Sequence, residues 1–368
     1  MFIRLSAIGL TLAAALVAAA AAALPARDAA LRGVEFIRTT QQSDGGFGGF
    51  GPGQTMDAIF AIRSVGIDPN TFVKDGKTPA DFLRANAAAV NRPGLAAKFI
   101  LGALALGLDP RNVDGTDLTA VVRGAYDAGT GRYASDDFNQ ALAIIGLVAA
   151  GDPVPSAAVA ALRSSQVADG GWGFGGSSDP DSTAIVLQAL LAAGLPVSDP
   201  DVQEALGYLR ASQANDGGWG FDPAASNVNS TAFVVQALIA AGEDPEGPTY
   251  TKPGGNPIQF LLSQQQADGS FVGYDPAFAT NQVVPALMGR TFLNAPFTPL
   301  VQETPTPTAT PTSTATPAAT RTPTPAVAKT GTGSASSSGS GWTWAAVLAG
   351  AALLTAGAAA GAARGRRS

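Results

Sequence analysis

Apolar segments that end in glycine recur along the chain at a nearly constant distance. They cover residues 58–66, 95–107, 141–151, 183–194, 231–242 and, in a weaker form, 283–289. Their closing glycines lie 41, 44, 43, 48 and 47 residues apart. A fixed period of this length is typical of an architecture in which each repeat is one supersecondary unit.

A second set of helical segments alternates with the first. These segments are residues 29–41, 79–90, 117–126, 156–166, 201–213 and 257–265. The segment 201–213 has an apolar stripe opposite polar residues, which indicates a surface helix, whereas 183–194 is apolar on all sides and must be surrounded by protein. We therefore predict an all-α fold, an (α/α)6 toroid of six helical hairpins over residues 27–301, with little or no strand. An open α-solenoid has the same periodicity and stays an alternative.

The two ends of the chain carry targeting patterns. Residues 1–26 combine a positive start, an Ala/Leu-rich run and small residues, which is typical of a cleaved signal peptide. A Thr/Pro-rich and then Ser/Gly-rich stalk, residues 302–341, precedes an uncharged stretch, 342–363, long enough to span a membrane, and a basic tail, 364–368. We expect an exported protein, anchored in the cell membrane with its toroid outside. Residues 327–331 (VAKTG) are similar to a sortase signal, so cell-wall attachment is the alternative.

Four glycine-rich loops have a glutamine followed six residues later by Trp or Phe. The pairs are Gln41 and Phe47, Gln166 and Trp172, Gln213 and Trp219, and Gln265 and Phe271. We expect these residues to be structural staples: the amide reaches carbonyl groups at a helix end, and the ring fills the gap between hairpins with its polar edge accessible. The third repeat has only a degenerate version at residues 130–133. The loops contain no Lys or Arg, which disfavours a phosphate site.

In their fullest form these loops read Q-x-x-D-G-G-[WF]-G, and they resemble the QW-type repeat of the terpenoid cyclase and protein prenyltransferase superfamily. The resemblance covers residues 29–293 and implies an inner ring around a cavity, entered where the loops lead into the inner helices. Prenyltransferase activity requires a zinc ion held by Asp, Cys and His. The chain has no Cys and no His, which also excludes disulfides, thiol nucleophiles and a Ser-His-Asp triad. Secreted corrinoid-binding proteins resemble the same toroid and are not catalytic.

The segments that lead into the inner helices are rich in Asp, Asn, Ser and Thr. Seven of these residues form a candidate ligand-binding rim: Asp57, Asp136, Asp137, Asp179, Asp181, Asn229 and Asn281. The alternative role for each is to cap a helix N-terminus.

Residues 179–184 (DPDSTA) are similar to the D-x-D-D-T-A segment of class II terpenoid cyclases, whose middle carboxyl group protonates an alkene. The resemblance implies that Asp181 is the acid if the protein is an enzyme, but Ser182 replaces the last Asp. A cyclase also implies two helical domains and an aromatic lining, whereas the inner helices here are mostly aliphatic. Because a helix N-terminus favours an ionised carboxylate, we expect Asp181 to be ionised at neutral pH, as a cap or as part of an acidic rim, with no catalytic residue in the chain.

Charge narrows the range of partners. Residues 133–301 contain 4 Lys or Arg and 16 Asp or Glu. This imbalance disfavours nucleic acid and favours a cationic group; no cofactor is certain, and calcium is the candidate ion. We predict a membrane-anchored surface toroid that binds a small ligand or a partner protein without catalysis. The alternatives are an enzyme (terpenoid-cyclase-like, prenyltransferase-like or, with two carboxylates, glycan-active) and a surface adhesion module.

Overall fold

The computed structural model describes residues 25–48, 50–222 and 225–301, and these residues are mostly helical. The signal peptide up to residue 24, the stalk, the membrane span and the basic tail lie outside the described residues and stay predictions. Within the described ranges, no helix has the length and the apolar character needed to cross a membrane. The predicted predominance of helix is confirmed.

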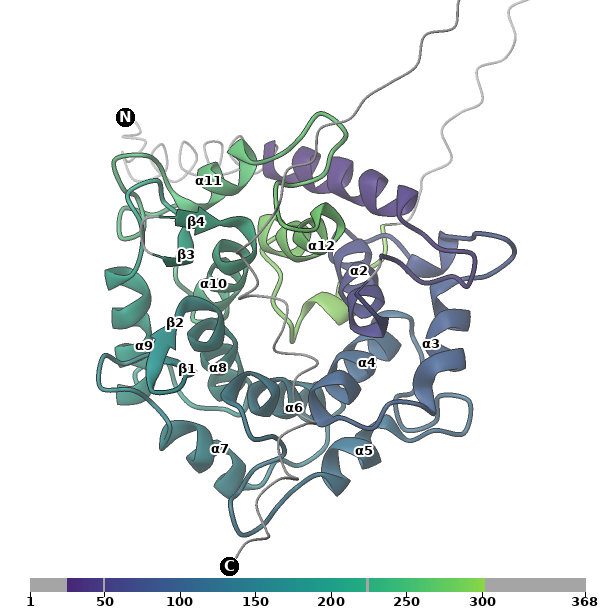
Figure 1. Ribbon diagram of the computed structural model, residues 1–368, viewed down its shortest axis with the longest axis horizontal. Helices are drawn as coiled ribbons and strands as arrows, with labels where there is room; N and C mark the ends of the chain where they lie inside the picture. Colours follow the sequence, from purple (N-terminus) through teal and green to yellow (C-terminus); the bar gives the residue numbers. More distant parts are fainter. Residues whose placement is uncertain (1–24, 49, 223–224, 302–368) are drawn as a thin grey trace, which may run out of the picture. The chain divides into compact units, whose positions relative to one another are not determined.

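Six helices line the inside of a ring (Figure 1). They are α2 (Pro52–Ser64), α4 (Pro93–Ala105), α6 (Asp137–Ala149), α8 (Pro180–Ala192), α10 (Val228–Ala240) and α12 (Pro276–Leu287). Each contacts the next, and α12 contacts α2, so the described helices close on themselves. They begin two to seven residues before the apolar segments, because the polar entry residues form their first turns. Their middle residues are fully buried, as the all-round apolar pattern predicts.

The second set of helices lies outside this ring (Figure 1). It comprises residues 25–39, α3 (Pro79–Ala87), α5 (Leu118–Gly124), α7 (Ser156–Arg163), α9 (Pro200–Ala211) and α11 (Pro257–Ser263). A short 3-10 helix, η1 (Pro69–Thr71), precedes α3. In α9 the apolar stripe, Val202, Ala205, Leu206 and Leu209, is buried against the inner ring. Amphipathic periodicity alone therefore separates the outer helices from the inner ones.

Two short β-hairpins depart from the expectation of little or no strand. Strand β1 (Trp172–Phe174) pairs with β2 (Ser177–Asp179), and β3 (Trp219–Asp222) pairs with β4 (Ala225–Asn227), both antiparallel. The aromatic end of a glycine-rich loop pairs here with the polar segment that enters the next inner helix. Helical periodicity carries no information about such a pairing, because both strands lie between the periodic segments.

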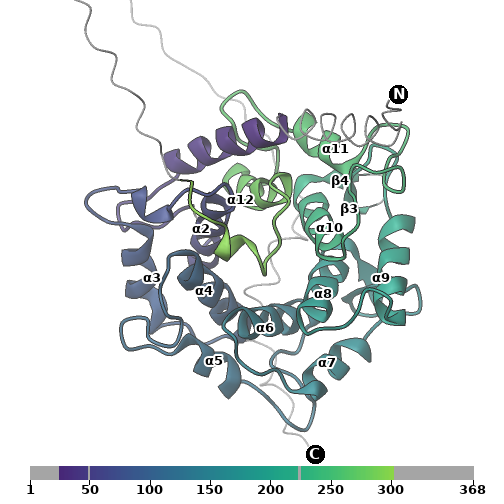
Figure 2. The same ribbon diagram turned by 180° about the vertical axis from the view of Figure 1, so that it is seen from behind.

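The chain that follows α12 turns into the ring. The segment from residue 290 to the 3-10 helix η2 (Ala295–Phe297) lies inside the inner helices in both views (light green in Figures 1 and 2). The chain then reaches the end of α2, where the Val301 N–H donates to the carbonyl of Gly66 at 2.8 Å. The Phe292 ring is buried, with its centroid 5.1 Å from that of Phe60 on α2 and 5.9 Å from that of Phe233 on α10. The Phe233 ring in turn contacts Phe138 on α6 at 5.8 Å. These four rings, which we call the phenylalanine cluster, connect three inner helices through the centre.

Candidate functional site

The glutamine of each glycine-rich loop joins two repeats. The Gln213 Nε2 donates to the carbonyl of Gly217 in its own loop (2.9 Å) and to that of Tyr250 ahead of the next outer helix (2.8 Å). Gln41, Gln166 and Gln265 make the equivalent pairs of bonds. The second acceptor of Gln265 is Ala29 in the first outer helix, 236 positions earlier in the chain, so this amide links the last repeat to the first.

The aromatic residues of these loops are enclosed. Trp172 and Trp219 are fully buried, and their indole Nε1 atoms donate to the carbonyls of Leu162 (2.7 Å) and Leu209 (2.8 Å) at the ends of the outer helices. The expectation of an accessible polar edge is therefore wrong: the indole N–H is bonded inside the protein. Phe47 and Phe271 are buried in the same way.

Two kinds of hydrogen-bond partner of these loops were not predicted from the sequence. The main-chain N–H of each loop aromatic donates to a threonine hydroxyl of the following inner helix, the threonines being Thr55, Thr183, Thr231 and Thr280. In the degenerate third repeat, Gln140 on α6 takes the place of the loop glutamine. Its Nε2 donates to the carbonyls of Gly131 (3.3 Å) and Ala158 (3.1 Å), and its Oε1 accepts from the N–H of Tyr133. The signal for the threonines was their recurrence at the fourth or fifth residue of the following inner helix; Gln140 lies outside the loop motif.

The predicted rim residues lie on or next to the first two turns of the inner helices, which we call the N-terminal mouth. The inner helices run in the same direction, since first turns contact first turns from helix to helix. Asp136 and Asp179 act as caps, with carboxylates that accept the N–H groups of Asn139 (2.8 Å) and Ser182 (2.7 Å). Asp137 instead pairs with the Arg132 guanidinium at 2.9 Å. For these three residues the structure gives local partners.

Four other rim residues point to neighbouring helices. The Asp57 carboxylate is buried and meets the Lys98 Nζ of α4 at 2.8 Å. Burial raises the pKa of Asp57, and the Lys98 charge opposes that shift.

The Asn229 Nδ2 donates to the Gln282 Oε1 on α12 (2.6 Å). The Asn281 Nδ2 donates to the Gln54 carbonyl (3.4 Å), while its buried Oδ1 has no partner among the described residues. The mouth is therefore polar, and its side chains are partly committed to each other.

The environment of Asp181 differs from that of the ionised cap that we expected. Asp179 is the cap of α8, while Asp181 lies in the first turn with its Oδ1 buried and without a hydrogen-bond partner in the described part of the chain. Burial raises the pKa of Asp181 from 3.8 to about 7; a hydrogen bond from Ser230 on α10 opposes this shift, and the nearby Asp179 carboxylate adds to it. Near neutral pH a large share of Asp181 is therefore protonated, which corrects the expectation of an ionised cap.

Comparisons with known proteins agree with this architecture. A family model, the squalene-hopene cyclase C-terminal domain, matches residues 139–281. A variant of the type II terpene cyclase MstE from Scytonema, without ligand, superposes with a TM-score of 0.55 at 14% identity, covering 74% of this chain and 98% of that one. Another variant, in complex with geranylgeranyl dihydroxybenzoate, gives 0.53 at 12% identity, covering 72% and 97%. The chain thus shares the fold of type II terpene cyclases, and residues 139–281 match the squalene-hopene cyclase C-terminal domain. No curated protein matches the sequence.

The segments that lead into four of the inner helices carry exposed aromatic side chains. Phe50, Phe174, Phe221 and Tyr274 are 55%, 71%, 61% and 79% exposed, and each follows the buried aromatic residue of its loop by two or three positions. The Phe50 ring stacks on Tyr274 at 6.2 Å and meets Phe278 edge-on at 6.4 Å. Large apolar side chains that gather at one end of a protein mark an interaction site more often than scattered ones do.

A metal site finds less support in the toroid. Among the described residues, no three Asp or Glu side chains come together in a group that could hold a metal ion. Because Asp57, Asp136, Asp137 and Asp179 have protein partners, the rim carboxylate with an open role is Asp181. The acidic rim is thus a set of separate contacts.

Proposed function

We propose that this protein is a surface-anchored αα-toroid that binds, without catalysis, a molecule with an apolar body and a hydrogen-bonding group at its N-terminal mouth. The observation that carries the proposal is the buried, unpartnered Oδ1 of Asp181 in a mouth whose entry segments carry exposed aromatic residues. A buried polar atom without a partner is rare in native proteins and calls for an explanation. A ligand donor that pairs with this oxygen would supply one.

The electrostatic setting of the mouth supports a neutral or cationic ligand group. Asp179 and Asp181 lie side by side, and the loops that surround them contain no Lys or Arg. Protonated Asp181 can donate a hydrogen bond, and ionised Asp181 can accept one or attract a cation. The aromatic faces of Phe174 and Phe221 would contact the apolar body of the ligand.

The predicted ends of the chain fit a receptor. A signal peptide exports the toroid, a stalk of about forty residues holds it away from the membrane, and the segment 342–363 anchors it. The six-hairpin count belongs to the same proposal, and the closed contacts of the inner helices support it.

Acid catalysis of the terpene-cyclase type is the second candidate, and specific observations favour it. A pKa near 7 allows Asp181 to hold a proton at neutral pH, as a catalytic acid must. The phenylalanine cluster supplies aromatic rings inside the ring of helices. In addition, this chain covers 98% of a type II terpene cyclase, so a second helical domain is not a requirement of that activity. Against it stands Ser182, which replaces the last Asp of the motif.

Two measurements on the same protein preparations distinguish the non-catalytic binder from the cyclase. The full-length protein is purified from its producing cells, examined by native mass spectrometry for a co-purified molecule, and then incubated with squalene and with linear prenyl diphosphates. We expect a bound mass in the wild type that is reduced in Asp181→Asn and in Phe174→Ser, with no product from either substrate. Asp199→Asn, at the N-terminus of the outer helix α9, is the matched control and should retain the bound mass.

Two results would overturn the proposal that the protein binds a ligand at the N-terminal mouth without catalysis. Conversion of squalene or a prenyl diphosphate by the wild type, lost in Asp181→Asn, would establish the cyclase instead. A bound mass that Asp199→Asn reduces as much as Asp181→Asn would place the ligand away from the mouth.

A further inference from the structure

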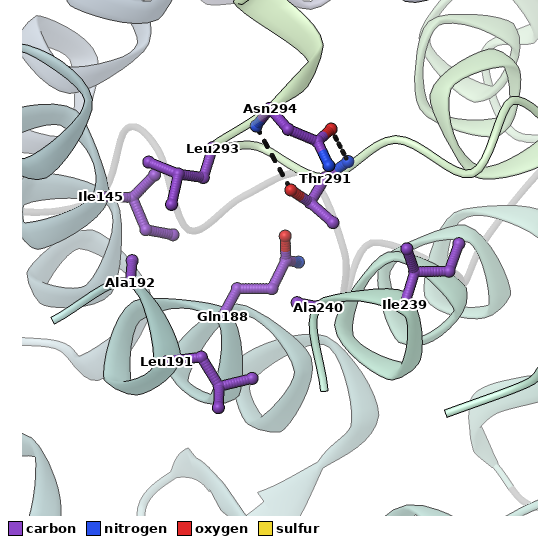
Figure 3. A pocket seen from close by; sticks show the side chains of 9 residues that line it. All are labelled: Ile145, Gln188, Leu191, Ala192, Ile239, Ala240, Thr291, Leu293 and Asn294. Atoms are coloured by element: carbon purple, nitrogen blue, oxygen red, sulfur yellow. Dashed lines mark hydrogen bonds between the residues drawn. The ribbon is translucent and has the colours of Figure 1, made fainter. Parts of the chain in front are cut away.

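A pocket of about 250 Å³ lies at the opposite end of the inner ring from the N-terminal mouth (Figure 3). Its walls come from the last turns of α6, α8 and α10 and from residues 291–294. The apolar side chains that line it are Ile145, Leu191, Ile239 and Leu293. Asp181 and Asn229 lie in the first turns of α8 and α10, so the length of these helices separates the pocket from the mouth.

One polar group in the pocket has an unused donor. Gln188 on α8 is 4% exposed and lines the pocket, with its amide directed into it (Figure 3). The Gln188 Oε1 accepts the main-chain N–H of Phe292 at 3.2 Å. That bond fixes which amide atom is the oxygen, so the other atom is the NH₂ group. The Nε2 has no hydrogen-bond partner in the part of the chain that the structure describes.

The other polar residues of the pocket satisfy one another. The Thr291 N–H donates to the Asn294 Oδ1 at 2.9 Å, and the Asn294 N–H donates to the Thr291 Oγ1 at 3.3 Å. This reciprocal pair holds the turn that closes the pocket. Because a buried donor without a partner destabilises a protein, the Gln188 NH₂ group is the feature of this pocket that points to a ligand.

The lining defines the chemistry of that ligand. None of the residues around the pocket carries a charge, so an ionised ligand would lose its hydration without a counter-charge. An apolar cavity of about 150 Å³ holds benzene, so a pocket of this size takes a somewhat larger molecule. We propose that this pocket is a second ligand site, for a small neutral molecule with an apolar body whose carbonyl oxygen accepts a hydrogen bond from the Gln188 Nε2. This site is independent of the proposed function at the mouth.

A matched pair of probes tests the assignment. Acetophenone and ethylbenzene share a carbon skeleton, and only acetophenone has a carbonyl acceptor. Calorimetric titration of the full-length protein should show acetophenone binding at least about fivefold more tightly than ethylbenzene, since an unpaired buried donor remains with the hydrocarbon. In Gln188→Met that preference should disappear. In protein labelled with ¹⁵N-glutamine, acetophenone should shift one side-chain amide signal that is missing from Gln188→Met.

The neighbouring helix offers a control of the same residue type. Gln236 occupies the corresponding position of α10, is 1% exposed and does not line the pocket, so Gln236→Met should keep the preference for acetophenone. Ala192→Phe, which places a large side chain in the pocket and leaves Gln188 itself unchanged, should abolish the binding of both probes. Asp181→Asn should change neither affinity, which distinguishes this site from the mouth.

Three outcomes would overturn the proposal. The first is equal binding of the two probes by the wild type, as expected if a water molecule already satisfies the amide. The second is binding that survives Ala192→Phe, which remains informative if Gln188→Met fails to fold. The third is a loss of preference in Gln236→Met as large as in Gln188→Met.

Discussion

Replacing Gln213 by methionine tests whether the loop amides hold neighbouring repeats together. Methionine keeps the length of the side chain and removes both hydrogen bonds of the Nε2, to Gly217 at 2.9 Å and to Tyr250 at 2.8 Å. The residue is 7% exposed, so the two carbonyls lose their partners in a largely dry environment.

The expected loss in the free energy of unfolding follows from three groups, the two carbonyls and the Gln213 Oε1. Each carbonyl left without a partner costs about 1–3 kcal/mol. The substitution also removes the Gln213 Oε1, a buried acceptor that has no partner among the described residues, and this relieves a cost of similar size. The net loss in the free energy of unfolding is therefore about 2 kcal/mol. For a domain of this size that corresponds to a decrease in Tm of roughly 3–4 °C.

Thermal unfolding of the full-length variants, followed by far-UV circular dichroism, measures the effect. Gln42→Met is the control, since Gln42 is exposed and its Nε2 bonds only to the carbonyl of Thr40 in its own loop among the described residues. Hydrogen exchange should also become faster in the segment around Tyr250 in Gln213→Met and stay unchanged in Gln42→Met. If both variants melt within about 1 °C of each other, the loop amides do not join the repeats as we describe.

Three further changes probe the buried groups. Trp172→Ala should lower the unfolding free energy by about 3–5 kcal/mol in a denaturant titration, and a loss no larger than that of the exposed Phe174→Ala would contradict its buried role. Lys98→Met should destabilise by about 3–5 kcal/mol because it leaves the buried Asp57 carboxylate unpaired, and adding Asp57→Asn should restore most of the loss; no recovery would mean that the pair is incidental. The Tm of Asp181→Asn should rise relative to that of the wild type between pH 5 and pH 8. The raised pKa of Asp181 stabilises the wild type fully below about pH 4, and this contribution is lost as the pH rises to about 7. A difference in Tm that stays constant with pH would refute the pKa shift.

Much of the fold follows from two periodicities in the sequence. The all-round apolar character of residues 183–194 and the one-sided stripe of 201–213 predict an inner and an outer helix, and the structure has them as α8 and α9. The spacing of Gln213 and Trp219 also predicts contacts between repeats, because a side chain at a helix end has carbonyl groups within reach. These are local signals that repeat, so one repeat explains the next.

The contacts at the centre of the ring are not predicted by any such repeated signal. Phe292 comes after the last repeat, and its partners Phe60 and Phe233 lie more than fifty residues away in the chain. Nothing in the spacing of phenylalanines distinguishes a ring that faces the centre from one that packs between helices. In the same way Lys98 pairs with Asp57 across 41 residues, a distance at which side chains meet only because α2 and α4 are neighbours in the closed ring.

The ionisation of Asp181 shows which physical effect the sequence hides. The position of this residue in the first turn of a helix is readable, and the helix dipole there favours the carboxylate by about 0.3–1 kcal/mol. Its burial against α10 is not readable, and it shifts the pKa from 3.8 to about 7, which corresponds to an energy on the order of 4 kcal/mol. Desolvation therefore outweighs the dipole several times over. The pKa of a carboxyl group in the first turn of an inner helix therefore depends on the side chains that the neighbouring inner helix places around it. For Asp181 these contacts depend on the closed ring: Ser230 on α10 supplies a single hydrogen bond, and the Oδ1 of Asp181 has no partner among the described residues.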